Sequence, residues 1–115
     1  MNTDICEIVV TAENAETLVK LTRTLVEERL AACGQNITSI RSIYRWDGAV
    51  QDDAEARVGL RTRTALVPEL VERGERVKAL DSYDVPYVLA LPVVGGNPDY
   101  IEWVPAETRV PQPSH

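Results

Sequence analysis

The chain has 115 residues, enough for one domain with a modest core. Its 44% hydrophobic and 26% charged residues are typical of a folded, soluble protein. A net charge of −6 argues against nucleic acid and anionic membranes as partners, because phosphate binding needs clustered Lys and Arg. We expect a single domain over residues 1–110 and a disordered tail over residues 111–115.

The only histidine is His115, the last residue. A His–His metal site, a Ser-His-Asp triad and a Cys-His dyad are therefore excluded from the fold. No phosphate-cradling glycine loop is visible either, and we expect no enzymatic activity. Cys6 and Cys33 do not suggest a disulfide framework, and no signal peptide or membrane span is apparent, so we expect a cytoplasmic protein.

The first predicted elements are a strand and a helix. Residues 5–10 form an apolar run typical of a strand buried on both faces. Asn14 is a suitable N-cap for the helix that follows, which we expect to end at residues 31–33, with Gly34 just beyond it. The predicted apolar face of this helix consists of Leu18, Leu21, Leu25, Thr22, Val26 and Leu30.

A long β-hairpin is predicted next, with strands over residues 36–47 and 49–62. The dipeptide Asp47-Gly48 favours a two-residue type I′ turn, which places Trp46 opposite Ala49. The face expected under the helices carries Ile37, Ala56, Val58 and Leu60. The opposite face carries Ile40, Tyr44 and Trp46, and no helix remains to cover them.

The hairpin is too long for its own domain. Twelve strand residues at about 3.3 Å each span roughly 40 Å, whereas a compact chain of this size is about 35 Å across. An overhanging ribbon with exposed aromatic side chains favours contact with a second copy of the chain. The alternative is a solvated hairpin whose aromatic residues have no partner.

The remaining elements complete the order strand, helix, strand, strand, helix, strand. A second helix is predicted over about residues 65–80 and a strand over 87–91, and Asn97 with Pro98 indicates the start of a short helix through Trp103. This order predicts an α+β, ferredoxin-like βαββαβ fold with an antiparallel sheet. The core-facing residues expected on the second helix are Leu66, Leu70, Val71, Val77 and Leu80.

Several residues are candidates for binding. Cys33 suits copper or zinc as a thiolate, although a free cysteine is often only a small buried hydrophobe. Arg61, on an otherwise apolar strand, can hold an anion or pair with an acidic neighbour. Asp81, Asp84 and Glu107 are either oxygen ligands for a harder ion or parts of solvated segments.

Aromatic residues form another group of candidates. They can line a cleft between subunits, although packing is the more common role of such side chains. The group consists of Tyr83, Tyr87, Tyr100 and Trp103.

Four motifs in this order and spacing resemble the CutA family of divalent-cation tolerance proteins. They are TLVEERLAAC (24–33), SIYRWDG (42–48), YDVPYVLALPV (83–93) and GNPDYIEWV (96–104). The resemblance runs from about Ile5 to Arg109 and implies a homotrimer of ferredoxin-like subunits. It also implies that the long hairpins reach neighbouring subunits, which would make Ile40, Tyr44 and Trp46 trimer contacts.

The resemblance implies two alternative functions. The first is tolerance of copper or another divalent cation, with weak metal binding through Cys33; the residues themselves indicate no cofactor. The second is a PII-like signalling or scaffold role, in which a small ligand or a protein binds between subunits without metal. The residues implied for this intersubunit cleft are Arg61, Asp81, Tyr83, Tyr87 and Trp103.

The sequence departs from the family pattern at several positions. The family's His-Pro-Tyr-x-x-Pro-Glu segment has Asp81 in place of His and Tyr87 in place of Glu. Arg61 replaces a family lysine, and Val10 stands where some members carry cysteine. Of the family's proposed soft metal ligands, only Cys33 remains.

Overall fold

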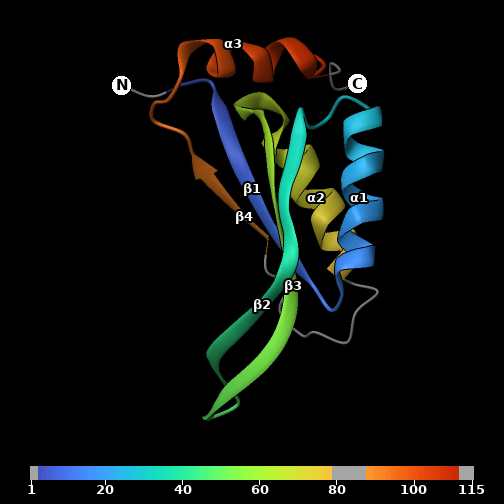
Figure 1. Ribbon diagram of the computed structural model, residues 1–115, viewed down its shortest axis with the longest axis vertical. Coiled ribbons are helices and arrows are strands. Elements are labelled where there is room, and N and C mark those ends of the chain that lie inside the picture. The colour runs from blue at the N-terminus through green and yellow to red at the C-terminus, as the bar shows by residue number, and fades with distance from the viewer. Residues whose placement is uncertain (1–2, 79–87, 112–115) are drawn as a thin grey trace.

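The computed structural model describes residues 3–78 and 88–111, with three helices, a short 3-10 turn and one antiparallel sheet (Figure 1). The four strands lie in the order β2-β3-β1-β4. This arrangement confirms the predicted ferredoxin-like α+β fold. The elements are β1 (Ile5–Ala12), α1 (Ala15–Glu27), β2 (Cys33–Trp46), β3 (Ala49–Arg63), η1 (Thr64–Leu66), α2 (Val67–Lys78), β4 (Val88–Pro92) and α3 (Pro98–Glu107).

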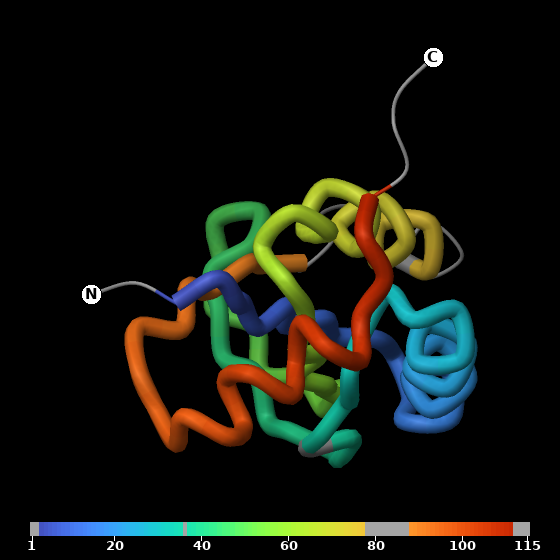
Figure 2. The backbone as a smooth tube through the Cα atoms, turned by 90° about the horizontal axis from the view of Figure 1, so that it is seen from above, coloured from blue at the N-terminus to red at the C-terminus, as the bar shows by residue number. Residues whose placement is uncertain are grey.

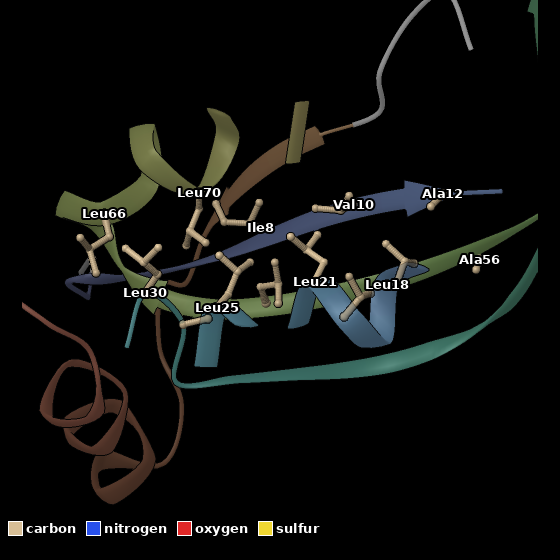
Figure 3. Close-up of a cluster of buried hydrophobic side chains, with 13 residues drawn as sticks. Ile8, Val10, Ala12, Leu18, Leu21, Leu25, Leu30, Ala56, Leu66 and Leu70 are labelled. Atoms are coloured by element: carbon tan, nitrogen blue, oxygen red, sulfur yellow. The ribbon is translucent and has the colours of Figure 1, made fainter. Parts of the chain in front are cut away.

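The main core lies between the sheet and the layer formed by α1 and α2 (Figures 1 and 3). Alternate residues of β1 face these helices, and β3 contributes a second row of buried side chains beside them. β1 is buried along nearly its whole length, as its composition predicts. The largest core members are Ile8, Leu18, Leu25, Leu30, Leu60, Leu66 and Leu70.

Helix α1 begins as predicted but ends earlier. The Asn14 side chain accepts a hydrogen bond from the Thr17 amide at 2.9 Å, which confirms Asn14 as the N-cap. The helix ends at Glu27, and Arg29 adopts a left-handed conformation with φ of 62°. The predicted end at residues 31–33 is therefore wrong. The left-handed residue that follows the helix is Arg29, whereas the sequence analysis expected Gly34 in that role.

The early helix end changes the roles of two apolar residues. Val26 is exposed, so its predicted place on the buried face is wrong. Leu30 is buried as expected, but it reaches the core from the turn after α1, where its amide bonds to the Leu25 carbonyl at 2.9 Å.

Gly34 lies in β2 and permits a close approach between β2 and α1. A Cβ atom at this position would overlap the side-chain methyl group of Thr22 and lie 3.0 Å from Leu60 Cδ2. The absence of a side chain at Gly34 thus lets the first residues of β2 pack directly beneath the helix.

The β2–β3 hairpin has the predicted turn and register. Asp47 and Gly48 both have positive φ values, 52° and 76°, as a two-residue type I′ turn requires. Trp46 pairs with Ala49 and Tyr44 with Gln51, as expected. A bulge between Gln35 and Thr38 shifts the register nearer the core. Ile37, Ala56, Val58 and Leu60 nevertheless contact the main core, so the predicted inward face is confirmed.

The tip half of the hairpin projects beyond the core as an arm, which we define as residues 40–55 (Figure 1). β1 pairs with β3 only from Ala56 onward, so within the described chain the arm strands pair only with each other. The longest dimension of the molecule is 43 Å, as the predicted strand length requires. The large apolar side chains exposed on the arm are Ile43, Trp46 and Val50.

The second half of the chain agrees with the predicted elements, with shifted boundaries. The helix expected over 65–80 begins as η1 and continues as α2, and the later strand is β4. Helix α3 is longer than expected and reaches Glu107, and the Asn97 side chain accepts bonds from the Asp99 and Tyr100 amides, as predicted for an N-cap. Leu80 and the tail residues 112–115 lie outside the described residues. No helix of the described part is long and apolar enough to cross a membrane.

We predict that Gly34→Ala lowers the free energy of unfolding by about 1–3 kcal/mol, because the added methyl group forces β2 away from α1. Urea denaturation measures this change. Gly95→Ala is the matched control, since a Cβ at Gly95 meets no atom within 4 Å. Equal stability of the two variants would contradict the close approach described for Gly34.

Candidate functional site: a polar row on the open face of the sheet

The candidate site lies on the sheet face opposite α1 and α2. Residues that pair across neighbouring strands place their side chains on the same face. Cys33 of β2 pairs with Arg61 of β3, Arg61 pairs with Glu7 of β1, and Glu7 pairs with Leu91 of β4. The strand registers thus align a thiol, a guanidinium and a carboxylate in one row across the sheet.

Helix α3 crosses the end of this face and supplies a fourth side chain to the row (Figures 1 and 2). Val104 of α3 packs with Ile5 and Ala32 in a second, smaller core cluster that Tyr100 also contacts. The Arg63 side chain donates hydrogen bonds to the Thr108 carbonyl at 2.8 Å and to the Pro105 carbonyl. These contacts fix α3 against the sheet and hold Tyr100 over the row.

The Arg61 guanidinium connects the members of the row. It forms an ion pair with Glu7 Oε1 at 3.1 Å, and both side chains are largely shielded from water. It also donates hydrogen bonds to Tyr100 Oη at 3.2 Å and to Gln35 Oε1 at 3.1 Å. Tyr100 Oη in turn lies 3.3 Å from the sulfur of Cys33. We call Glu7, Cys33, Gln35, Arg61 and Tyr100 the polar row.

Partial burial shapes the electrostatics of the polar row. Burial is the largest influence on Tyr100 and raises its pKa; the Cys33 contact acts in the same direction and the Arg61 hydrogen bond opposes it. For Arg61, burial by itself lowers the pKa, but the interactions with Tyr100, Glu7 and Cys33 outweigh it and the net pKa is raised. At neutral pH the row therefore presents a fixed guanidinium and a neutral phenol beside the thiol.

The sequence contained partial signals for the site residues that the sequence analysis did not identify. Glu7 is the one acidic residue in an otherwise apolar strand, and Arg61 interrupts an apolar stretch in the same way. Gly59 gives Glu7 its space, because a Cβ at Gly59 would overlap the Glu7 carboxylate. Sequence reasoning gave Arg61 either a bound anion or an acidic neighbour, and the structure shows an ion pair with Glu7. Neither Glu7 nor Gln35 was identified from the sequence.

The candidate residues from the sequence occupy three places. Cys33 and Arg61 lie together in the polar row, and Trp103 lies beside it, with its ring tilted by 35° to that of Tyr100 and the two ring centroids 5.6 Å apart. Ile40, Tyr44 and Trp46 lie in the arm, away from the row. Glu107 is exposed at the end of α3. Asp81, Tyr83, Asp84 and Tyr87 lie outside the described residues.

The described residues do not form a metal site by themselves. Between residues 3 and 78 and between 88 and 111, no three His, Cys, Asp or Glu side chains group closely enough to hold an ion. Cys33 offers one soft ligand, but the Arg61 charge lies beside it. Cys6 is buried on the helix side of the sheet, 3.4 Å from the Thr64 hydroxyl, and does not join the row. A closed coordination sphere therefore does not fit these residues alone.

A ferredoxin-like sandwich with a projecting β-arm and a helix across its open face defines a distinct class of small α+β proteins. Among solved structures, CutA1 from Oryza sativa has a TM-score of 0.79 and 41% identity, covering 94% of this chain and 96% of that one. The divalent cation tolerance protein of Thermus thermophilus has a TM-score of 0.76 and 38% identity, covering 91% and 99%.

Sequence comparison identifies the family. The model of the CutA1 divalent ion tolerance protein matches residues 6–107, so the chain belongs to the CutA1 divalent ion tolerance family. The divalent-cation tolerance protein CutA of Thermus thermophilus is 41% identical over 88% of this chain and 95% of its own length. The chloroplastic CutA of Arabidopsis thaliana is 42% identical over 89% of this chain, which spans about half of that relative's length (54%).

We predict that Tyr100 ionises above the ordinary tyrosine pKa of about 10. An alkaline titration followed by tyrosinate absorbance, with Tyr100→Phe as the reference, isolates this group. Because the folded-state pKa is raised, its contribution to stability is fully present below about pH 10 and is lost as the pH rises through the folded-state pKa. A Tyr100 midpoint at or below the ordinary value would contradict the dominance of burial over the Arg61 hydrogen bond.

Proposed function

We propose that this protein acts in divalent-cation tolerance as a homotrimer, with the arm of each subunit covered by a neighbour. The family match over residues 6–107 supports the cation-tolerance role. The exposed apolar residues on the two faces of the arm, Ile43 and Val50 on one and Trp46 on the other, support self-association, because closed symmetry can bury such side chains and the strand edges. Both cysteines are free, as suits the cytoplasmic location that we also propose.

In this proposal Cys33 is a weak metal ligand. A thiolate suits copper or zinc, and Cys33 is only partly buried on the open face. One subunit offers a single sulfur in its polar row, and the neighbouring positive charge of Arg61 opposes a bound cation. We therefore expect micromolar binding that depends on assembly of the subunits.

The Arg61 contacts favour a second candidate, a PII-like sensor that binds a small ligand between subunits without metal. Arg61 directs hydrogen bonds toward Gln35 and Tyr100 on the open face, and Trp103 lies at the edge of the same surface. A guanidinium with adjacent phenol and amide groups recognises an anionic or polar ligand more readily than a cation. Both candidates describe a binding protein, and neither requires a catalytic group.

Titration calorimetry with Cu(II) and with Zn(II) distinguishes the two candidates. We predict micromolar binding to the unaltered protein and at least a tenfold loss in Cys33→Ala. Cys6→Ala is the matched control, because Cys6 is buried on the other side of the sheet and should leave metal binding unchanged. Light scattering on the same samples reports whether each variant keeps its subunit number.

Two results would contradict the metal proposal. One is the absence of heat from either metal with the oligomer intact, which would favour the small-ligand candidate. The other is equal binding by the Cys33→Ala variant and the unaltered protein, which would place the metal elsewhere.

A further inference from the structure

A shallow groove of about 340 Å³ lies between α1 and α2, on the helix side of the sheet, opposite the polar row. Three basic side chains line it: Lys20 from α1, and Arg73 and Arg76 from α2. The hydroxyl-bearing residues Thr17 and Thr24 and the apolar residues Leu21 and Val77 complete the wall. Its volume lies within the range of small-molecule sites, roughly 300–1,000 Å³.

The charged side chains that line the groove are basic, although the whole protein is acidic. The chain carries a net charge of −6, yet none of the described residues that line the groove is acidic. Basic side chains can attract an anion locally even when the average charge repels it. Each of the three cations has a carboxylate partner just outside the lining, so an anionic ligand has to displace that partner or share the cation with it.

Arg73 is held in place by its partner. Two of its nitrogens donate to the Glu28 carboxylate at 3.1 and 2.8 Å, and its side chain is only 25% exposed. This bond from the end of α1 to the middle of α2 spans one end of the groove. A bidentate pair orients the guanidinium without occupying all of its five donors.

The other two cations are held only loosely. Lys20 pairs with Glu16 at 3.8 Å and Arg76 pairs with Glu72, each within its own helix. The Lys20 and Arg76 side chains are 78% and 68% exposed. Exposed ion pairs of this type contribute little to stability, so a ligand with a higher charge density can displace the carboxylates at little cost.

We propose that the groove between α1 and α2 is a binding site for a small phosphate monoester with an apolar body. The dianionic phosphate lies between Lys20, Arg73 and Arg76, because the three cations of the lining match its charge and its several acceptor oxygens. Thr17 and Thr24 supply neutral donors. The apolar part of the ligand packs on Leu21 and Val77, which distinguishes such a ligand from inorganic phosphate.

Titration calorimetry with phenyl phosphate, inorganic phosphate and phenol at constant salt tests this proposal. We expect phenyl phosphate to bind at least tenfold more tightly than inorganic phosphate, and phenol to give no measurable binding. The double variant Lys20→Glu, Arg76→Glu should weaken phenyl phosphate binding at least tenfold. Both residues are exposed, so the fold should tolerate these changes.

The matched control is Arg23→Glu, which reverses an exposed charge on α1 that does not line the groove. It should leave the affinity for phenyl phosphate within twofold of the unaltered value. Three results would overturn the proposal: no binding of phenyl phosphate, equal affinity for inorganic phosphate, or equal weakening by the control variant. Circular dichroism of each variant confirms that the helices are retained.

Discussion

The architecture depends on the unequal lengths of the strands that flank β3. β1 pairs with β3 only between Ala56 and Arg63, while β2 follows β3 to the turn. Residues 49–55 therefore have β2 as their only neighbour in the described chain, and the arm leaves the core as a two-stranded ribbon. Such a ribbon is marginally stable by itself in water, so the arm favours coverage by another subunit.

β3 also positions the central residue of the candidate site. Inside the core region, β3 presents Val58 and Leu60 to the helices and Arg61 to the open face. Arg61 then links Glu7 of β1 to Tyr100 of α3, and Tyr100 contacts the Cys33 thiol. The cluster explains why the polar row is a poor metal site: its central group is a cation, and the sulfur already has a polar neighbour. Any metal role for Cys33 must therefore involve groups beyond this row.

The groove between α1 and α2 would provide a second binding function, separate from that of the polar row. The polar row and the groove lie on opposite sides of the sheet. A ligand on the helix side would leave the open face available for the contact between subunits that we propose. Binding at one site can thus be measured without disturbing the other.

Much of the fold could be predicted because local signals were strong. Asp47-Gly48 determined the hairpin register, and Asn14 and Asn97 marked two helix starts. The end of α1 could not be predicted, because Arg29 adopts a positive φ that ordinarily favours glycine. Gly34 was expected just after the end of α1 but lies in β2. A glycine is needed there because Thr22 lies so close, and a local sequence pattern does not contain this tertiary constraint.

The site was only half predictable for a similar reason. Cys33 and Arg61 were singled out by residue type, and an acidic neighbour was one of the two partners considered for Arg61. The identities of Glu7 and Gln35 depend on strand pairing across the sheet, and the contact of Tyr100 with Cys33 depends on how α3 crosses it. Such relations arise from the assembled sheet and leave only weak traces in sequence.

Hydrogen–deuterium exchange on the unaltered protein tests most directly whether the arm is covered by another subunit. Peptides from residues 40–55 should exchange as slowly as peptides from β1, because contacts with a neighbour exclude water and suppress opening of the ribbon. Exchange of the arm as fast as that of an isolated hairpin, while β1 stays protected, would contradict the account.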